Sequence, residues 1–235
     1  MLVNGTSGSG KTTAVNQIVK ELFRQGHHIV YLDFSHSCTP KQLASHGIEK
    51  TFQEDNILRI QLESALENPE ELTSALEIMQ TENQILLFET ETYSDEVESF
   101  LTLLYETVSA KEELEIFLVI DELQYKKGSP LYRIMEMGRR NGISLIHIFQ
   151  GSHQTKPKQY SLMNQSDIRL IFRLTDYDDA EQIAKSNGLK PPGKFIEKIR
   201  QIPKHHCFVI GNLEDHNEEL YNNRFIEIAI PNINM

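Results

Sequence analysis

The chain has few cysteines and no long apolar run. Its 235 residues include two cysteines, Cys38 and Cys207, which form neither a disulfide framework nor a zinc-binding pattern. No apolar run approaches the roughly 20 residues that a membrane helix needs. The N-terminus also lacks the charged and apolar regions of a signal peptide. These absences argue against disulfide-rich secreted proteins and membrane-spanning proteins, and we expect a cytoplasmic protein with no membrane segment.

Basic residues are also scarce relative to acidic ones. The 23 Lys and Arg against 34 Asp and Glu give a formal net charge of −11. Free nucleic-acid-binding domains are usually basic, because phosphate neutralisation supplies most of their sequence-independent affinity. If this chain engages DNA, it does so through a local patch or through another subunit. Residues 151–160, which contain Lys156 and Lys158, form the one loop suited to DNA contact, and a flexible surface loop explains them equally well.

Apolar strand patterns alternate with helical patterns along the whole chain, without a repeat or a Gly/Ser/Pro-rich linker. The unbroken apolar run at 116–120 is typical of a central parallel strand buried on both faces. The alternation predicts an α/β fold, a doubly wound and mostly parallel sheet with helices on both faces. We expect a single domain over 1–235, with the polar, acidic segment 36–83 as an insertion.

The strands and helices can be placed from their periodicity. The predicted strands are 1–4, 28–33, 57–62, 85–88, 116–120, 143–149, 168–172, 206–210 and 225–230. The predicted helices are 13–25, 69–79, 96–109, 131–140 and 178–186.

The strongest motif follows the first of these strands. The run Gly5-Thr6-Ser7-Gly8-Ser9-Gly10-Lys11-Thr12 matches G-x-x-x-x-G-K-[ST], the phosphate-binding P-loop. Glycines let successive backbone N–H groups point at phosphate oxygens, and the following helix adds the positive end of its dipole. Lys11 can then reach the β- and γ-phosphates, Thr12 can offer its hydroxyl to Mg²⁺, and Thr13 continues the binding segment. The motif predicts nucleotide binding.

Two further polar features follow apolar strands. Asp121 and Glu122 come directly after 116–120, where a carboxylate can hold Mg²⁺ through water and a second one can orient the attacking water. An acidic pair at this point can also be a solvated turn, but the P-loop upstream favours the Walker B interpretation. Gln150 ends the strand 143–149 and could sense the γ-phosphate, or it simply faces solvent. Arg139 and its neighbour Arg140, taken alone, are ordinary surface charges.

In this order the motifs resemble the HerA–FtsK superfamily of hexameric DNA-pumping ATPases. The similar stretches are GTSGSGKT, the strand ending in Asp33, FLVIDE, GRRNGISLIHIFQ, DIRLIFRL after Asn164, Asp178-Asp179-Ala180, and CFVIG. The resemblance covers most of the chain apart from roughly residues 36–83, and it is most specific over 138–150. It implies a RecA-like P-loop ATPase core.

The resemblance also implies roles for individual residues. Lys11 and Thr12 would bind phosphate and Mg²⁺, Asp121 would assist the metal, Glu122 would be the catalytic base, and Gln150 the sensor. Arg139 is the first choice and Arg173 the second for an arginine finger that reaches a neighbouring subunit. Such a finger increases the rate of nucleotide hydrolysis by about 10³- to 10⁵-fold.

The expected function is therefore an ATPase subunit of a homo-oligomeric, hexameric ring that moves or remodels DNA. Many family members carry an N-terminal domain, and its absence here predicts a separate effector, a nuclease or another DNA-acting subunit. The glutamate that the family often shows shortly after the second-strand acid is missing from DFSHSC. One alternative is a non-motor switch or scaffold that ATP binding assembles, and another is a small-molecule kinase. His205, His206 and Cys207 do not predict a metal site, because adjacent strand residues point to opposite faces.

Overall fold

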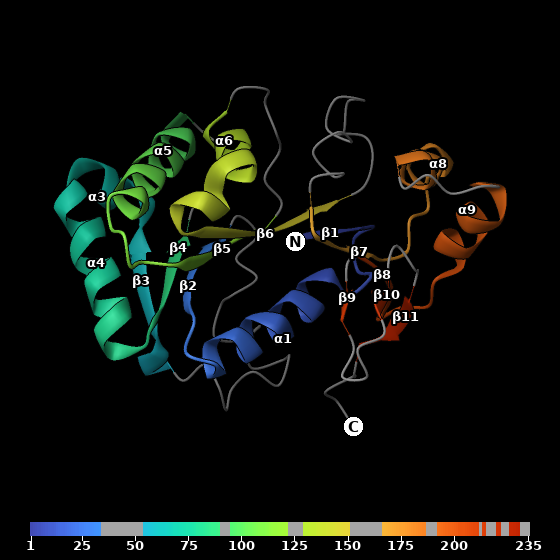
Figure 1. Cartoon of the computed structure of the whole chain (residues 1–235), viewed down its shortest axis with the longest axis horizontal. Helices are drawn as coiled ribbons and strands as arrows, with labels where there is room; N and C mark the ends of the chain where they lie inside the picture. Colours follow the sequence, from blue (N-terminus) through green and yellow to red (C-terminus); the bar gives the residue numbers. More distant parts are fainter. Residues whose placement is uncertain are drawn as a thin grey trace. The chain divides into compact units, whose positions relative to one another are not determined.

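The computed structural model describes residues 1–33, 54–89, 95–121, 129–150, 166–186, 192–211, 213–214, 220–221 and 226–230. The chain divides into two compact units. Unit 1 comprises residues 1–14 and 148–233, and unit 2 comprises residues 15–147. Helix α1 (Lys11–Arg24) and strand β6 (Ile143–Gln150) each begin in one unit and end in the other. Figure 1 labels the elements of both units.

Unit 2 is built on a parallel sheet. Its strands lie in the order β6-β5-β2-β4-β3, with β2 at His28–Asp33, β3 at Ile57–Gln61, β4 at Ile85–Glu89 and β5 at Ile116–Asp121. Strand β2 pairs in parallel with both β4 and β5, and β3 pairs in parallel with β4. The interiors of β2, β4 and β5 are apolar, as expected where helices cover both faces of a parallel sheet, whereas the edge strand β3 contains Arg59 and ends at Gln61.

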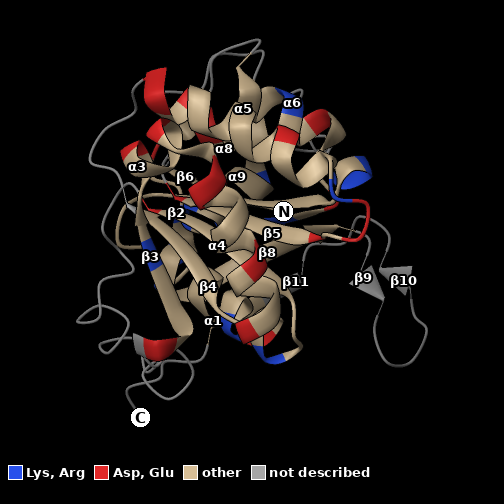
Figure 2. Ribbon diagram, turned by 90° about the vertical axis from the view of Figure 1, so that its left-hand side faces the viewer, with Lys and Arg blue, Asp and Glu red and all other residues tan. Residues whose placement is uncertain are grey.

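Helices cover both faces of this sheet. On one face Val30 and Leu32 of β2 belong to a large core that also contains apolar residues of α3 (Leu62–Glu67), α4 (Pro69–Glu82), α5 (Asp95–Ser109) and α6 (Pro130–Met137). Tyr31, between them, points the other way and donates a hydrogen bond to Asn16 of α1 at 3.4 Å. Figure 2 shows α1 across the strands from α5 and α6. This alternation confirms the doubly wound arrangement within unit 2.

Two short 3-10 helices, η1 (Glu54–Asn56) and η2 (Gly138–Asn141), complete the helical elements described in unit 2. Ser129 caps the N-terminus of helix α6: its Oγ accepts a hydrogen bond from the Tyr132 N–H at 3.4 Å, and Pro130 takes the first helical position. Asn83, the residue after α4, caps its C-terminus in a left-handed conformation with φ 51°. Both ends follow ordinary capping chemistry.

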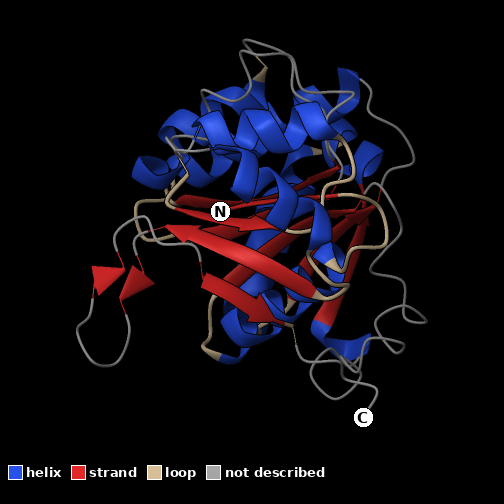
Figure 3. Cartoon of the chain, turned by 90° about the vertical axis from the view of Figure 1, so that its right-hand side faces the viewer, coloured by secondary structure: helices blue, strands red, loops and turns tan. Residues whose placement is uncertain are grey.

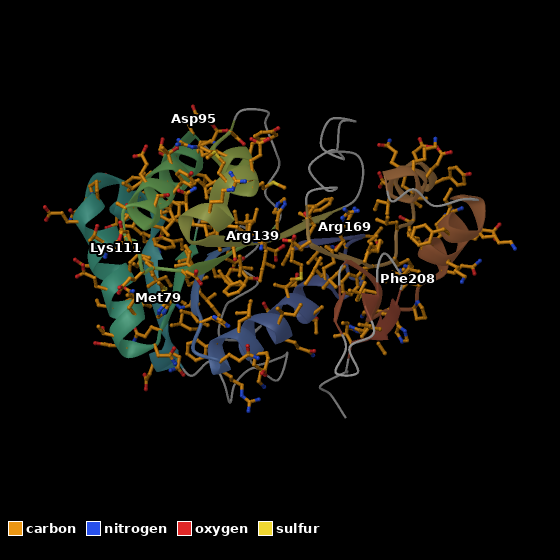
Figure 4. The ribbon with its side chains drawn as sticks, in the orientation of Figure 1. Met79, Asp95, Lys111, Arg139, Arg169 and Phe208 are labelled. Atoms are coloured by element: carbon orange, nitrogen blue, oxygen red, sulfur yellow. The ribbon has the colours of Figure 1, made fainter. Side chains whose placement is uncertain are left out.

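The outer surface of unit 2 is acidic. Glutamates and aspartates occupy the first turns of α3, α4 and α5, where they also complement the helix dipoles (red in Figure 2). Lys111, labelled in Figure 4, forms an ion pair with Glu77 at 3.2 Å between partly exposed side chains. These three helices contain ten Asp and Glu and no Lys or Arg.

Unit 1 contains the first strand and the C-terminal strands, in the order β11-β8-β7-β1. Strand β1 (Leu2–Gly5) pairs in parallel with β7 (Ile168–Ile171). Antiparallel pairings then join β7 to β8 (His206–Gly211) and β8 to β11 (Ile226–Ala229). Figure 3, which faces unit 1, shows these strands in red. Helices α8 (Tyr177–Ser186) and α9 (Pro192–Gln201) pack against each other, and β9 (Leu213–Glu214) and β10 (Leu220–Tyr221) form a small hairpin.

Part of the segment predicted as an insertion is described. Residues 54–83 of that segment contain η1, β3, α3 and α4, and β3 pairs with β4 at the edge of the sheet. The single-domain prediction and the insertion itself stay predictions. Among the helices described in the chain, none combines the length and the apolar character required to cross a membrane.

Candidate functional site: a phosphate cradle and two acidic strand ends

The predicted P-loop forms a tight turn between β1 and α1 in unit 1. Strand β1 ends at Gly5, and α1 begins at Lys11 with a hydrogen bond from the Ala14 N–H to the Gly10 carbonyl at 3.0 Å. Inside the turn the Ser9 N–H donates to the Thr6 carbonyl at 3.3 Å. The loop therefore has the strand–turn–helix context that the motif requires.

Three glycines are needed at this turn for different reasons. Gly8 and Gly10 adopt φ values of 70° and 106°, which L side chains rarely adopt. Gly5 has no such angle, but a Cβ on it would lie 2.6 Å from the Cβ of Phe172. A Cβ on Gly10 would lie 2.9 Å from Nδ1 of His205. The sequence thus uses glycine where the backbone must turn or approach a neighbour closely.

Polar groups within the loop suit a bound anion. Lys11 is 5% exposed, and its Nζ donates to the Thr6 carbonyl at 3.0 Å. The Ser9 hydroxyl is buried and makes no hydrogen bond in the described part of the chain. No acidic residue occurs before Glu21, so the dipole of α1 acts near its N-terminus without an opposing carboxylate in the same segment.

Two segments of unit 1 hold the loop from outside. The carbonyl of Arg173, just after β7, accepts hydrogen bonds from both the N–H and the Oγ1 of Thr6, at 2.9 and 3.1 Å. The N–H of His205, just before β8, donates to the Ser9 carbonyl at 3.1 Å. Sequence reasoning missed His205, because no local pattern signals that its backbone turns toward a loop almost 200 residues away.

Unit 2 contains two acidic strand ends. Asp33 and Asp121 end the neighbouring parallel strands β2 and β5 and lie directly opposite each other in the register. Both are buried, with exposures of 0% and 1%. Parallel strands bring their carboxyl ends to one edge of a sheet, which is where open α/β sheets bind ligands. The structure thus brings together the two strand-end acids that the sequence singled out.

The arginines predicted as fingers lie in different places. Arg139, labelled in Figure 4, is on η2 in unit 2 and its side chain is exposed. Arg173 is also exposed, but its backbone is bonded to the P-loop of its own chain. Gln150 is the last residue of β6. Glu122, Lys156 and Lys158 lie outside the described residues.

Each unit, taken by itself, holds groups that suit a magnesium nucleotide. A Cβ on Gly8 would meet no atom within 4 Å, so the loop is open at that position, and the P-loop supplies N–H donors, a buried lysine and the Thr12 hydroxyl. Carboxylates and hydroxyls are the oxygen ligands that Mg²⁺ prefers, and Asp121 supplies a buried carboxylate. Among the described side chains no cluster of three or more His, Cys, Asp or Glu forms a separate metal site.

Burial perturbs the pKa of three groups away from this loop. Burial raises the pKa of the Cys207 thiol to about 12 and lowers the pKa of the Arg169 guanidinium. The pKa of His28 is lowered, chiefly by burial and secondly by the neighbouring charge of His27. None of these three residues carries a predicted role in the reaction.

Comparisons with known proteins agree with this geometry. The family model for the AAA domain matches residues 1–156. The genome packaging NTPase B204 from Sulfolobus turreted icosahedral virus 2, solved with AMPPCP, is similar over 96% of both chains, with 15% identity and a TM-score of 0.58. No curated protein sequence matches the chain.

Two further solved structures share the fold. VirB4 of Thermoanaerobacter pseudethanolicus is similar over 98% of this chain and 88% of its own, with 11% identity and a TM-score of 0.64. The bacterial conjugative coupling protein TrwBdeltaN70 is similar over 98% of this chain and 84% of its own, with 11% identity and a TM-score of 0.59. Identities this low carry the fold and not the function.

The family match, the P-loop geometry and the mostly parallel sheet together confirm the RecA-like fold and the resemblance to HerA–FtsK ATPases that the motifs predicted. The chain belongs to the AAA domain family and is a P-loop ATPase.

Proposed function

We propose that this ATPase works as a homo-oligomeric ring in which each ATP is hydrolysed between two protomers, and that the ring moves or remodels DNA together with a separate effector protein. The observation that carries the proposal is the complete phosphate cradle of unit 1; within unit 2, the acids Asp33 and Asp121 end neighbouring strands in register, as a Walker B strand requires.

Individual residues of the chain are assigned separate roles in nucleotide binding and hydrolysis. Backbone N–H groups of the P-loop and Lys11 hold the phosphates, and Thr12 with Asp121 would hold Mg²⁺, which when bound neutralises charge on the phosphate oxygens. Glu122 follows Asp121 directly, and we assign it the orientation and deprotonation of the attacking water. Gln150, at the end of β6, is assigned the contact that reports the γ-phosphate.

The trans finger is assigned to Arg139. An arginine that serves a neighbouring protomer must be exposed, and the Arg139 side chain on η2 is exposed. Arg173 is less suited, because its carbonyl is bonded to Thr6 of its own P-loop at 2.9 and 3.1 Å. These bonds hold the backbone of Arg173 beside the P-loop of its own chain.

We propose that the ring moves along or remodels DNA, on the basis of the sequence resemblance and of the similar structures. The resemblance to HerA–FtsK ATPases covers the motifs of the reaction, and similar structures include a genome packaging NTPase and a conjugative coupling protein. The acidic surface of α3, α4 and α5 in unit 2 is unsuited to phosphate backbones. DNA contact is therefore assigned to the loop with Lys156 and Lys158.

Two measurements test the proposal. Glu122→Gln should retain Mg·ATP without hydrolysing it, while the wild type turns over many times and faster with DNA. The native mass of the wild type should increase from a small species to a closed ring on addition of Mg·ATP. Unchanged turnover in Glu122→Gln would remove the assignment of the base, and a mass that stays monomeric with ATP would remove the ring.

The acidic surface favours one alternative, a switch or scaffold that ATP binding assembles without movement along DNA. In that case hydrolysis is insensitive to DNA, and Lys156→Ala combined with Lys158→Ala leaves the ATPase rate unchanged. The motor predicts that the double variant loses DNA stimulation but keeps the basal rate.

A further inference from the structure

His205 makes three contacts that join the P-loop to the C-terminal strands of unit 1. Its N–H donates to the Ser9 carbonyl at 3.1 Å, and its own carbonyl accepts from the Ile230 N–H at 2.7 Å. Its imidazole Nδ1 lies 2.9 Å from the position that a Cβ on Gly10 would occupy, so the ring fills the space beside that glycine. One residue thus touches two consecutive positions of the phosphate cradle.

The backbone of His205 is held in an unfavourable conformation to make these contacts. Its φ of 63° is left-handed, and Asn83 is the one other non-glycine residue of the described ranges with positive φ. Asn83 ends a helix, where such an angle is ordinary. His205 ends no helix; it is the third residue of the turn that the hydrogen bond from the His206 N–H to the Pro203 carbonyl closes at 3.1 Å. The left-handed angle lets its N–H reach Ser9 while its carbonyl faces Ile230.

A glycine would fit this angle with less strain than histidine, so the side chain itself needs a reason. The segment Gly8–Gly10 has two positive φ angles and is intrinsically permissive. A cradle binds phosphate well only if its N–H groups already point at the ligand before it arrives. The imidazole beside Gly10 and the bond to Ser9 restrict the two residues that precede Lys11.

We propose that His205 is a positioning residue for the nucleotide: its imidazole packs beside Gly10 and keeps the Ser9–Gly10 backbone in the phosphate-binding conformation. The inference rests on the proposed use of this P-loop for Mg·ATP. It does not require the ring, the trans finger or DNA.

The test compares variants that separate the turn from the cradle. His205→Gly keeps the N–H and suits the φ of 63°, so the melting temperature without ligand stays within a few degrees of the wild type. The Kd for Mg·ATP, measured by calorimetry on the full chain, rises about fivefold, the effect of about 1 kcal/mol. Under turnover the KM for ATP rises similarly while kcat is retained. Asn83→Gly is the matched control: it also places a glycine at a positive φ, but in unit 2, and it leaves the Kd for Mg·ATP unchanged.

An isosteric pair provides a second measurement that does not depend on glycine. Asn and Asp both tolerate a left-handed angle and both place a polar atom where Nδ1 of His205 lies. His205→Asn therefore binds Mg·ATP within about twofold of the wild type, whereas His205→Asp puts a negative charge beside the phosphates and weakens binding at least about tenfold.

The outcomes distinguish a failure of the role proposed for His205 from a failure of the proposed function. Equal Kd values for the wild type, His205→Gly and His205→Asp would overturn the positioning role and leave His205 as a turn residue. If His205→Gly does not fold, the Asn and Asp pair decides alone: equal binding of the two refutes the role. A wild-type chain that binds no Mg·ATP refutes the use of the P-loop, whereas one that binds it but shows no ring or hydrolysis refutes only the proposed function.

Discussion

Gly5→Ala is predicted to destabilise unit 1 before any ligand is involved. The added Cβ would lie 2.6 Å from the Cβ of Phe172, and the two atoms must move about 0.8 Å apart to reach an ordinary contact of 3.4 Å. The other close atom, Oγ of Ser9 at 2.9 Å, can rotate away, but a Cβ moves only with its backbone. The strain therefore falls on the pairing of β1 with β7.

The expected size follows from what that movement disturbs. It separates the Phe172 N–H from the Asn4 carbonyl, now at 2.8 Å, and the Thr6 N–H from the Arg173 carbonyl, now at 2.9 Å. Overpacking costs about 1–3 kcal/mol, and a weakened hydrogen bond costs about 1 kcal/mol. A loss of about 3 kcal/mol lowers the melting temperature of a chain this long by about 6–12 °C.

Gly8→Ala is the matched control in the same loop. A Cβ there meets nothing within 4 Å, and the cost is the φ of 70° alone, about 1 kcal/mol and about 2–4 °C. Both variants are compared with the wild type by calorimetry without nucleotide. Equal melting temperatures for the two variants would refute the close approach of β1 and β7 at Gly5.

Two further predictions concern titrating and reactive groups. Because the pKa of His28 is lowered in the folded chain, the unfolded state binds more protons below about pH 6.5, so the free energy of unfolding falls as pH drops through that range. His28→Gln should flatten this slope in urea titrations at pH 5 to 7, and an identical slope would contradict the assignment. Burial raises the pKa of Cys207 to about 12, so in a Cys38→Ser background a thiol reagent at pH 8 should modify the chain only after unfolding. Rapid modification of the native chain would show that the thiol is exposed.

The centre of the sheet was predictable because strands β2 and β5 are buried on both faces. The run 116–120 has no polar residue and became β5, and Asp121 follows it at the strand end as expected. The motif at Gly5–Thr12 combined a local turn with a helix start, and both are present. Patterns formed by consecutive residues therefore predicted the central strand and the P-loop correctly.

Features that depend on contacts between distant segments were not predictable. Helix α9 begins at Pro192 and contains Gly193, two residues that disfavour a helix interior, and its amphipathic pattern over 192–201 was not recognised. His205 was considered only as a metal ligand, whereas its backbone holds Ser9 across nearly the whole chain. The attachment of Arg173 to Thr6 likewise follows from the pairing of β1 with β7, which no local pattern encodes.

The central claim is that each ATP is hydrolysed at a site shared by two protomers. Lys11→Ala removes the phosphate contact of one half of that site, and Arg139→Ala removes the finger of the other half, so each variant alone should lose ATPase activity. Mixing the two should restore part of the rate, since some interfaces then pair an intact P-loop with an intact Arg139. Recovery in the mixture is the predicted result. A mixture as inactive as its components, or an Arg139→Ala variant with wild-type turnover, would contradict the shared site.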